Sequence, residues 1–219
     1  DPTYNKAVWP STGNYCRGGA YNSKLLGCES VAILPAEMSN ERFDWLSKIA
    51  GEVIATPGCE SNVKEIFDKT WELRRTRKDV VIFNQFEEMG NVLWHYQVTG
   101  KAIADAYESL KTDTTRFAGA CFTSGSAGTM SAGDYLKEQY PHAKLAVGEA
   151  LQCPTLLENG FGGHRIEGIG DKHVPWVHNV KNTDMVIDID DEDSQNLLRL
   201  FNTEDGHRYL TEIVGVPKE

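Results

Sequence analysis

The chain has 219 residues, of which 40% are hydrophobic, and a formal net charge of −10 at pH 7. This composition supplies a packed core for one domain or two small lobes, and it excludes disordered, collagen-like and low-complexity chains. The acidic balance, with basic side chains clustered only at positions 74–78, argues against nucleic acid or an anionic membrane as a partner.

Five short apolar runs are predicted strands, at residues 30–34, 52–55, 80–83, 117–123 and 144–148. Each is short and apolar on both faces, as strands of a buried parallel sheet should be. Segments of helical period lie between them, such as the one that follows a potential N-cap at Ser39. The alternation predicts an α/β fold with mostly parallel sheets and crossover helices in three layers.

Residues 25–83 are expected to form a small lobe, because they contain strands alternating with helices. Residues 1–24 with 84–219 are then expected to form part of a larger lobe. A chain that leaves one lobe, builds another and returns creates a cleft between them, where ligands commonly bind.

Cysteines, histidines and acidic residues give little sign of a metal or a disulfide framework. The five cysteines are odd in number and include no C-x-x-C pair, and no signal-like apolar segment opens the chain, so we expect reduced thiols in a cytoplasmic protein. No two histidines lie four residues apart, and we expect no metal. The acidic run at 188–193 is interpreted as the start of a helix rather than a calcium loop.

A glycine-rich segment, GSAGT at residues 125–129, stands between a predicted strand and a predicted helix. Small side chains let backbone N–H groups approach an anion, and the positive end of a helix adds to the attraction. The segment therefore predicts a phosphate site, with an ordinary tight turn as the alternative.

Two polar loops are further candidates for ligand binding. PSTGNYCRGGA begins at Pro10 and enters a predicted helix, and its Ser11 and Asn14 can bind a ligand or cap that helix. Gln85 follows the strand at 80–83, where parallel strands end and ligands bind, and the alternative is an exposed loop amide.

These segments occur in the order and at the spacing of one enzyme family. The matching segments are STGN at 11–14, M-S-x-E-R and G-x-E-V within 25–54, NQF at 84–86, GSAGT at 125–129 and HRIEGIGDKHVP at 164–175. From Ser11 to Ile189 the chain resembles the fold-type II pyridoxal-phosphate enzymes, whose fold is like that of the tryptophan synthase β chain, and it is most similar to their cysteine synthase branch. The resemblance implies that the small lobe is mobile.

The resemblance also implies a role for each segment. The phosphate of pyridoxal 5′-phosphate is expected at Gly125, Ser126, Ala127, Gly128 and Thr129, and its 3′-oxygen at Asn14. The substrate carboxylate is expected at Ser11, Thr12, Gly13, Tyr15 and Gln85. The implied reaction is β-replacement or β-elimination on a small amino acid such as serine, O-acetylserine or cysteine. The alternatives are a threonine or serine dehydratase and a non-catalytic binding fragment.

Two departures from the family pattern carry expectations of their own. The family's Schiff-base lysine precedes the asparagine loop in an S-x-K motif, and Lys6 has neither that distance nor that context. We therefore expect the catalytic lysine outside this chain and the chain alone to be inactive. The resemblance also implies that the full-length protein is a homodimer. Tyr15 and Arg17 replace small residues, which predicts a substrate with an extra polar or acidic group. The alternative is that Arg17 points to solvent or to Glu29.

Overall fold

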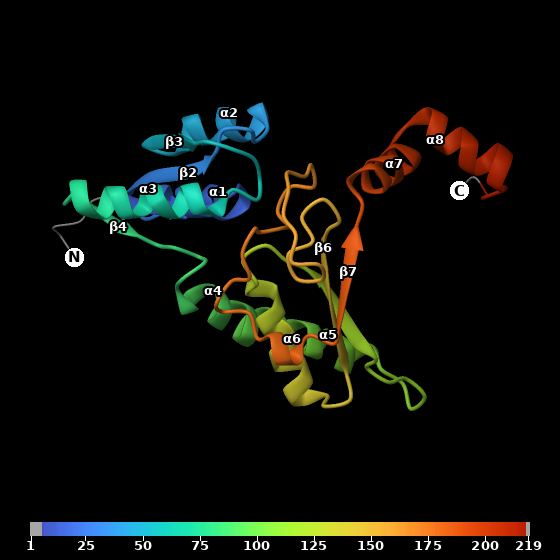
Figure 1. Cartoon of the computed structure of the whole chain (residues 1–219). Coiled ribbons are helices and arrows are strands. Elements are labelled where there is room, and N and C mark those ends of the chain that lie inside the picture. The colour runs from blue at the N-terminus through green and yellow to red at the C-terminus, as the bar shows by residue number, and fades with distance from the viewer. Residues whose placement is uncertain (1–5, 218–219) are drawn as a thin grey trace.

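The computed structural model describes residues 6–217, which form two parallel β-sheets with helices packed against them (Figure 1). The first sheet has the order β3-β2-β1-β4, from strands β1 (Lys6–Pro10), β2 (Glu29–Pro35), β3 (Glu52–Thr56) and β4 (Val80–Ile82). The second has the order β5-β6-β7, from strands β5 (Gly119–Thr123), β6 (Lys144–Ala150) and β7 (Met185–Ile189). The predicted α/β class with parallel sheets is confirmed.

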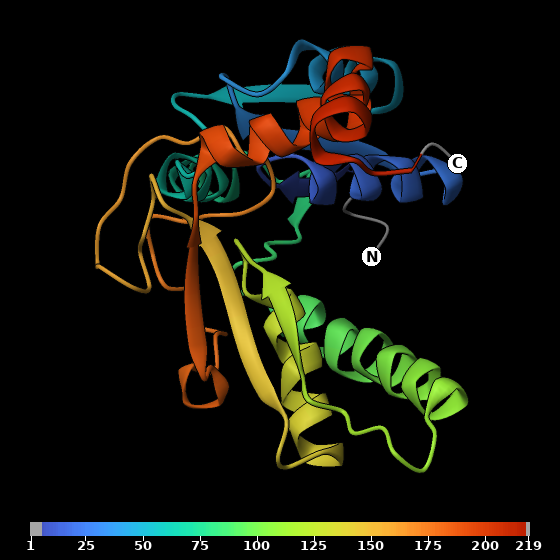
Figure 2. The same ribbon diagram turned by 90° about the vertical axis from the view of Figure 1, so that its right-hand side faces the viewer.

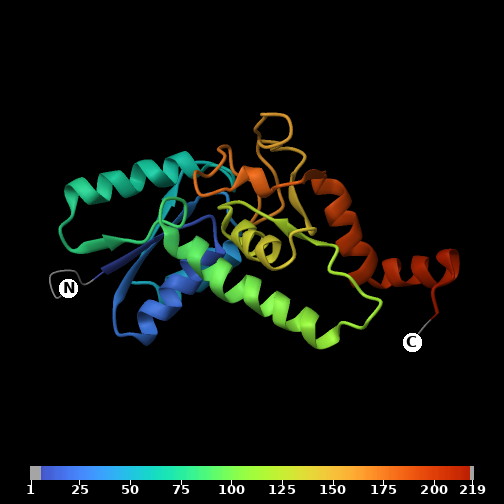
Figure 3. The ribbon, with the colours of Figure 1, turned by 90° about the horizontal axis from the view of Figure 1, so that it is seen from below.

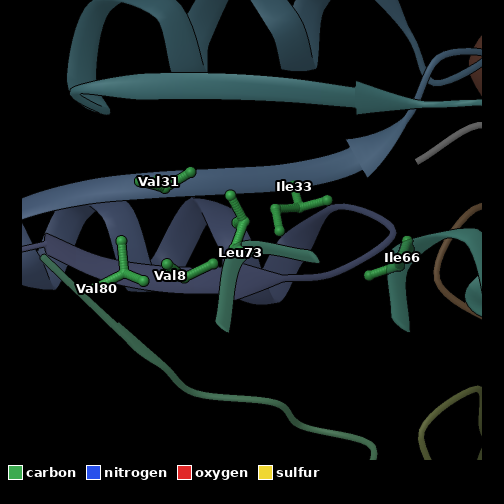
Figure 4. Close-up of a cluster of buried hydrophobic side chains, with 6 residues drawn as sticks. All are labelled: Val8, Val31, Ile33, Ile66, Leu73 and Val80. Carbon is green, nitrogen blue, oxygen red and sulfur yellow. The ribbon is translucent and has the colours of Figure 1, made fainter. Parts of the chain in front are cut away.

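Helices cover both faces of the first sheet. Successive side chains of β2 point to opposite faces, and since those from Val31 to Leu34 are apolar, each face needs a covering layer. Val31 and Ile33 pack with Ile66 of α3 in one buried cluster (Figure 4). Ala32 and Leu34 pack in a second cluster, which includes side chains of two other helices. The helices are α1 (Asn14–Leu25), α2 (Asn40–Ile49) and α3 (Val63–Thr76). The first sheet and these three helices, which we call the first unit (residues 6–82), therefore have the predicted three layers.

The second sheet carries a long helical segment and its own crossover helix. The long segment runs without a break through α4 (Met89–Trp94), the π-helical turn η1 (His95–Gly100) and α5 (Lys101–Leu110). Helix α6 (Gly128–Gln139) connects β5 to β6, and it lies beside the long segment in Figure 2 and Figure 3. The two come close at Gly100, where a Cβ would lie 2.8 Å from the Cβ of Tyr135.

Beyond β6 the chain is a long loop that contains the short helix η2 (Val180–Asn182) and leads into β7. Three helical elements follow β7: α7 (Asp191–Asn202), α8 (Glu204–Arg208) and the π-helical turn η3 (Tyr209–Val214). Asp190 caps α7, because its carboxylate accepts hydrogen bonds from the N–H groups of Glu192 at 2.7 Å and Asp193 at 3.2 Å. The acidic run thus opens a helix, as predicted. None of the helices within residues 6–217 has the length and apolar character needed to cross a bilayer.

The five predicted strands are present with boundaries shifted by up to two residues, but β1 and β7 were not predicted. Strand β1 changes the expected lobe boundary. It lies between β2 and β4, and α1 packs in a core cluster of the same sheet. Residues 6–24 therefore belong with the first sheet, whereas the sequence placed them with 84–219. The physical reason is that a central strand is fixed by pairing with distant segments, which its own five residues do not reveal.

Candidate active site

A cavity of about 470 Å³ lies where strands of both sheets end. Ser11 follows β1, Gln85 follows β4 and Ser124 follows β5, and all three line the cavity. The carboxyl ends of parallel strands are where ligands bind in α/β folds, and the volume is typical of a site for a small molecule. The other residues that line it are Thr12, Asn14, Tyr15, Val63, Phe86, Asn91, His95, Thr123, Gly125, Ser126, Gly128, Thr129, Gly168 and Gly170.

The glycine-rich loop leaves a row of backbone donors at this cavity. Residues 124–127 connect the end of β5 to the start of α6, and Ala127 takes a left-handed conformation with φ 62°. The N–H of Ala127 donates to Ser124 Oγ at 2.9 Å. Within residues 6–217, the N–H groups of Gly125, Ser126, Gly128 and Thr129 have no hydrogen-bond partner in the protein. Free N–H groups at the start of a helix form an anion site.

Asn91 of α4 holds this loop in place, and the sequence analysis did not single it out. Its Nδ2 donates to Ser126 Oγ at 3.0 Å and to the carbonyl of Gln85 at 3.4 Å. It also packs against Gly128, where a Cβ would lie 2.3 Å from Asn91 Oδ1. The asparagine therefore connects two of the predicted segments and explains why the helix begins with glycine.

The loop that follows β1 presents a second helix start to the cavity. Gly13 N donates to Ser11 Oγ at 2.9 Å, which satisfies the serine within the loop. Helix α1 has no side-chain cap, and the carboxamide of Asn14 makes no hydrogen bond within residues 6–217. Between the two predicted alternatives for Asn14, the geometry favours a ligand-binding side chain over a helix cap.

Tyr15 lines the cavity as part of an aromatic stack. Its ring meets Trp9 edge-on with centroids 5.4 Å apart, and Trp9 stacks on Phe83 at 4.7 Å. Burial, with a smaller contribution from the charge of Glu88, raises the pKa of Tyr15 to about 12. The phenol is therefore neutral at physiological pH and can donate a hydrogen bond into the cavity.

Three predicted residues do not line the cavity: Gly13, Ala127 and Arg17. The first two remain within the loops that form its walls. Arg17 lies elsewhere, with its guanidinium carbon 5.0 Å from the ring centroid of Trp45 on α2. This contact occupies the side chain in a cation–π interaction, so the structure does not support the expected contact between Arg17 and a substrate.

His95 is a further lining residue that the sequence analysis did not single out. Its Nδ1 lies 3.0 Å from Thr99 Oγ1, and burial lowers the pKa of its imidazole. The side chain is therefore biased toward the neutral form. His95 lies on η1, one helical turn after Asn91. The sequence did not reveal it as a lining residue, because spacing alone does not show which face of a helix meets a ligand.

No lysine within residues 6–217 lines the cavity. Lys6 lies at the start of β1, at the opposite end from the cavity, and its Nζ is 3.2 Å from Glu29 Oε2. Cys16 is buried beneath the loop, and desolvation raises the pKa of its thiol to about 12. A protonated buried thiol does not act as a nucleophile.

A larger cavity of about 730 Å³ lies between the first unit and α7, lined among others by Cys59, His164 and Arg199. It contains none of the predicted site residues and does not lie at the end of β1, β4 or β5. The smaller cavity therefore remains the candidate active site, because the free backbone donors and the free Asn14 carboxamide meet there.

Comparisons with known proteins agree with this geometry. A family model described as "Pyridoxal-phosphate dependent enzyme" matches residues 4–209. A probable cysteine synthase from Bacillus subtilis is 30% identical over 200 residues, which are 91% of this chain and 63% of that protein. A cystathionine beta-synthase from Saccharomyces cerevisiae is 29% identical over 216 residues, which are 94% of this chain and 42% of that protein.

The same relationship is seen among solved structures. A hydrogen sulfide-producing enzyme from Fusobacterium nucleatum is similar with a TM-score of 0.80 and 25% identity, over 90% of this chain and 64% of that one. The chain thus spans less than two thirds of the length of these relatives.

Proposed function

Because this chain belongs to the family of pyridoxal-phosphate-dependent enzymes, we propose that its cavity binds pyridoxal 5′-phosphate and a small amino acid. The reaction of the whole protein is then β-replacement or β-elimination on serine, O-acetylserine or cysteine. The observation that carries the proposal is that the N-termini of α1 and α6 open onto one cavity. Two positive helix ends suit two anionic groups, a phosphate and a carboxylate.

The residues fit the cofactor. The free N–H groups of the 125–129 loop form a cradle for the phosphate. The free carboxamide of Asn14 would donate to the 3′-oxygen of the cofactor ring. When bound, the cofactor supplies the electron sink that lets an amino acid lose its α-proton and its β-substituent.

The chain's own residues bind and orient the substrate. The start of α1 directs backbone N–H groups at a carboxylate, and the side chains of Thr12, Tyr15 and Gln85 surround the same space. Tyr15 stays protonated and donates a hydrogen bond to a polar substituent of the substrate, since its pKa is far above neutral. Closure of the first unit over the bound carboxylate would exclude water, as in other lid-gated enzymes.

The lysine that holds the cofactor in this family is proposed to come from residues outside this chain. We also propose a cytoplasmic homodimer for the full-length protein. The five apolar side chains exposed on the α4-η1-α5 segment support an interface there; they are Met89, Leu93, Trp94, Val98 and Leu110.

The experiment that tests the function is a product assay on the full-length gene product loaded with cofactor. With O-acetylserine and sulfide, cysteine should form at a rate that saturates with both substrates. Release of a 2-oxo acid from threonine or serine, with no cysteine formed, would instead identify a dehydratase. No cofactor absorbance and no product from any of these amino acids would identify a non-catalytic binding protein.

A further inference from the structure

Two charged side chains are buried behind the wall of the cavity, and the sequence analysis assigned them no role. Arg42 lies on α2, and Glu60 lies in the turn between β3 and α3. Arg42 is 8% exposed and Glu60 is 1% exposed. A charge is expensive to bury, so each must have specific partners or a function.

Arg42 connects the loop of Ser11 to Asn14, which follows β1, to Glu167 in the long loop between β6 and β7. Its Nη1 donates to the carbonyl of Thr12 at 2.9 Å, and its Nη2 lies 2.7 Å from Glu167 Oε2. The guanidinium also fills the space beside Gly13, where a Cβ would lie 1.6 Å from Nη1. One planar group therefore fixes the Thr12–Gly13 backbone and at the same time pairs with Glu167 behind the wall of the cavity.

Glu60 makes a parallel connection a few residues away. The N–H of Gly168 donates to Glu60 Oε1 at 2.6 Å. Gly168 belongs to the same segment as Glu167, and that segment joins the phosphate loop because Gly170 N donates to the carbonyl of Ser124 at 3.1 Å. The first unit is thus connected to the phosphate loop through a short chain of hydrogen bonds.

The neighbours of Glu60 strengthen this junction. Ser61 Oγ donates to the carbonyl of Gly162 at 2.9 Å, and Lys172 Nζ donates to Asn62 Oδ1 at 3.1 Å.

The second carboxylate oxygen of Glu60 is buried and has no partner within residues 6–217. An unsatisfied buried oxygen costs stability, which indicates a role other than maximal stability.

We propose that Arg42 and Glu60 are positioning residues that latch the turn of Thr12 to Asn14 onto the Glu167–Gly170 segment, so that the two walls of the cavity are held together when the first unit is closed. The mechanical coupling rests on the contacts alone. Its consequence, that the donors for a substrate carboxylate are held at a fixed place relative to the phosphate cradle, rests on the proposed function.

Hydrogen–deuterium exchange read by mass spectrometry tests the coupling on the 219-residue chain without cofactor. Glu167→Gln removes the ion pair with Arg42. We expect amide exchange to rise at least threefold in residues 163–170 and also in residues 11–15, which lie on the other wall. Arg42→Lys should do the same, because an ammonium group lacks the fork that reaches both partners.

Glu52→Gln is the matched control. It breaks the ion pair with Arg77 at 2.8 Å, and the Glu52 side chain is 38% exposed, compared with 35% for Glu167. This pair lies within the first unit, so exchange in both segments should stay unchanged. The proposal is overturned if Glu167→Gln leaves residues 11–15 unchanged, or if the control accelerates them equally. Since no cofactor is present, either result stands whether or not the proposed function holds.

Discussion

Substitution of Gly128 by alanine tests whether the start of α6 is shaped by Asn91. Gly128 has ordinary helical backbone geometry, so alanine alone should stabilise the helix by about 0.5–1 kcal/mol. The added Cβ would lie 2.3 Å from Asn91 Oδ1 and must displace that side chain. Overpacking costs about 1–3 kcal/mol, and each lost hydrogen bond of Asn91 costs about 1 kcal/mol. If Asn91 loses one of its two hydrogen bonds, the net loss in the free energy of unfolding is about 1–3.5 kcal/mol.

The assay is urea denaturation followed by far-UV circular dichroism. Gly18→Ala is the matched control, because Gly18 lies in α1 with nothing within 4 Å of its Cβ position, and it should gain stability. A double variant with Asn91→Ala should recover part of the loss, since it removes the clash. The reasoning is refuted if Gly128→Ala is as stable as the unmodified chain, or if the double variant shows no coupling.

Four further outcomes follow from the site. Asn14→Ala should weaken cofactor binding to the full-length protein about tenfold, which is a loss of about 1.4 kcal/mol that an absorbance titration can measure. The melting temperature should not fall, because the carboxamide of Asn14 makes no hydrogen bond within residues 6–217. Burial raises the pKa of Glu60 from 4.5 to about 6, so the native state binds its proton more tightly than the unfolded chain. Stability should therefore fall by about 2 kcal/mol as pH rises through this window, and urea titrations of Glu60→Gln should lack that loss. Arg17→Ala should cost about 0.5–1 kcal/mol of stability through the contact with Trp45 and leave the KM for amino acids unchanged in kinetic assays. Borohydride reduction with cofactor present should attach it to no peptide of this chain, and a labelled lysine within residues 1–219 on peptide mapping would contradict us.

Sequence reasoning predicted loops that line the cavity but not the residues that hold those loops in place. The glycine-rich loop, Asn14 and Gln85 were predicted because strand ends and small residues form local patterns. Strand β1 was missed because its five residues gain their strand character from pairing on both sides. Arg17 was expected at the substrate because position along the chain does not reveal the direction of a side chain, which Trp45 decides.

The residues that connect the segments were beyond the reach of the sequence for a related reason. Asn91 contacts Ser126 from 35 positions away, and Glu60 contacts Gly168 from 108 positions away. Such contacts follow from the packing of the two units, and no periodicity or spacing within either segment encodes them.

The π-helical turn η1 sets the phase between the two halves of the long helical segment. A π turn contains one more residue than an α turn, so it shifts every later side chain around the helix axis by about 100°. With this shift, α4 and η1 direct Asn91 and His95 to the cavity while Gly100 passes beneath Tyr135. Because the π turn holds one residue more than an α turn, removal of one residue from 95–99 would restore regular winding and leave Gly100 against α6. A residue with a Cβ at position 100 would instead come within 2.8 Å of the Cβ of Tyr135, so at this turn a change in residue identity disturbs the packing more than the loss of one residue.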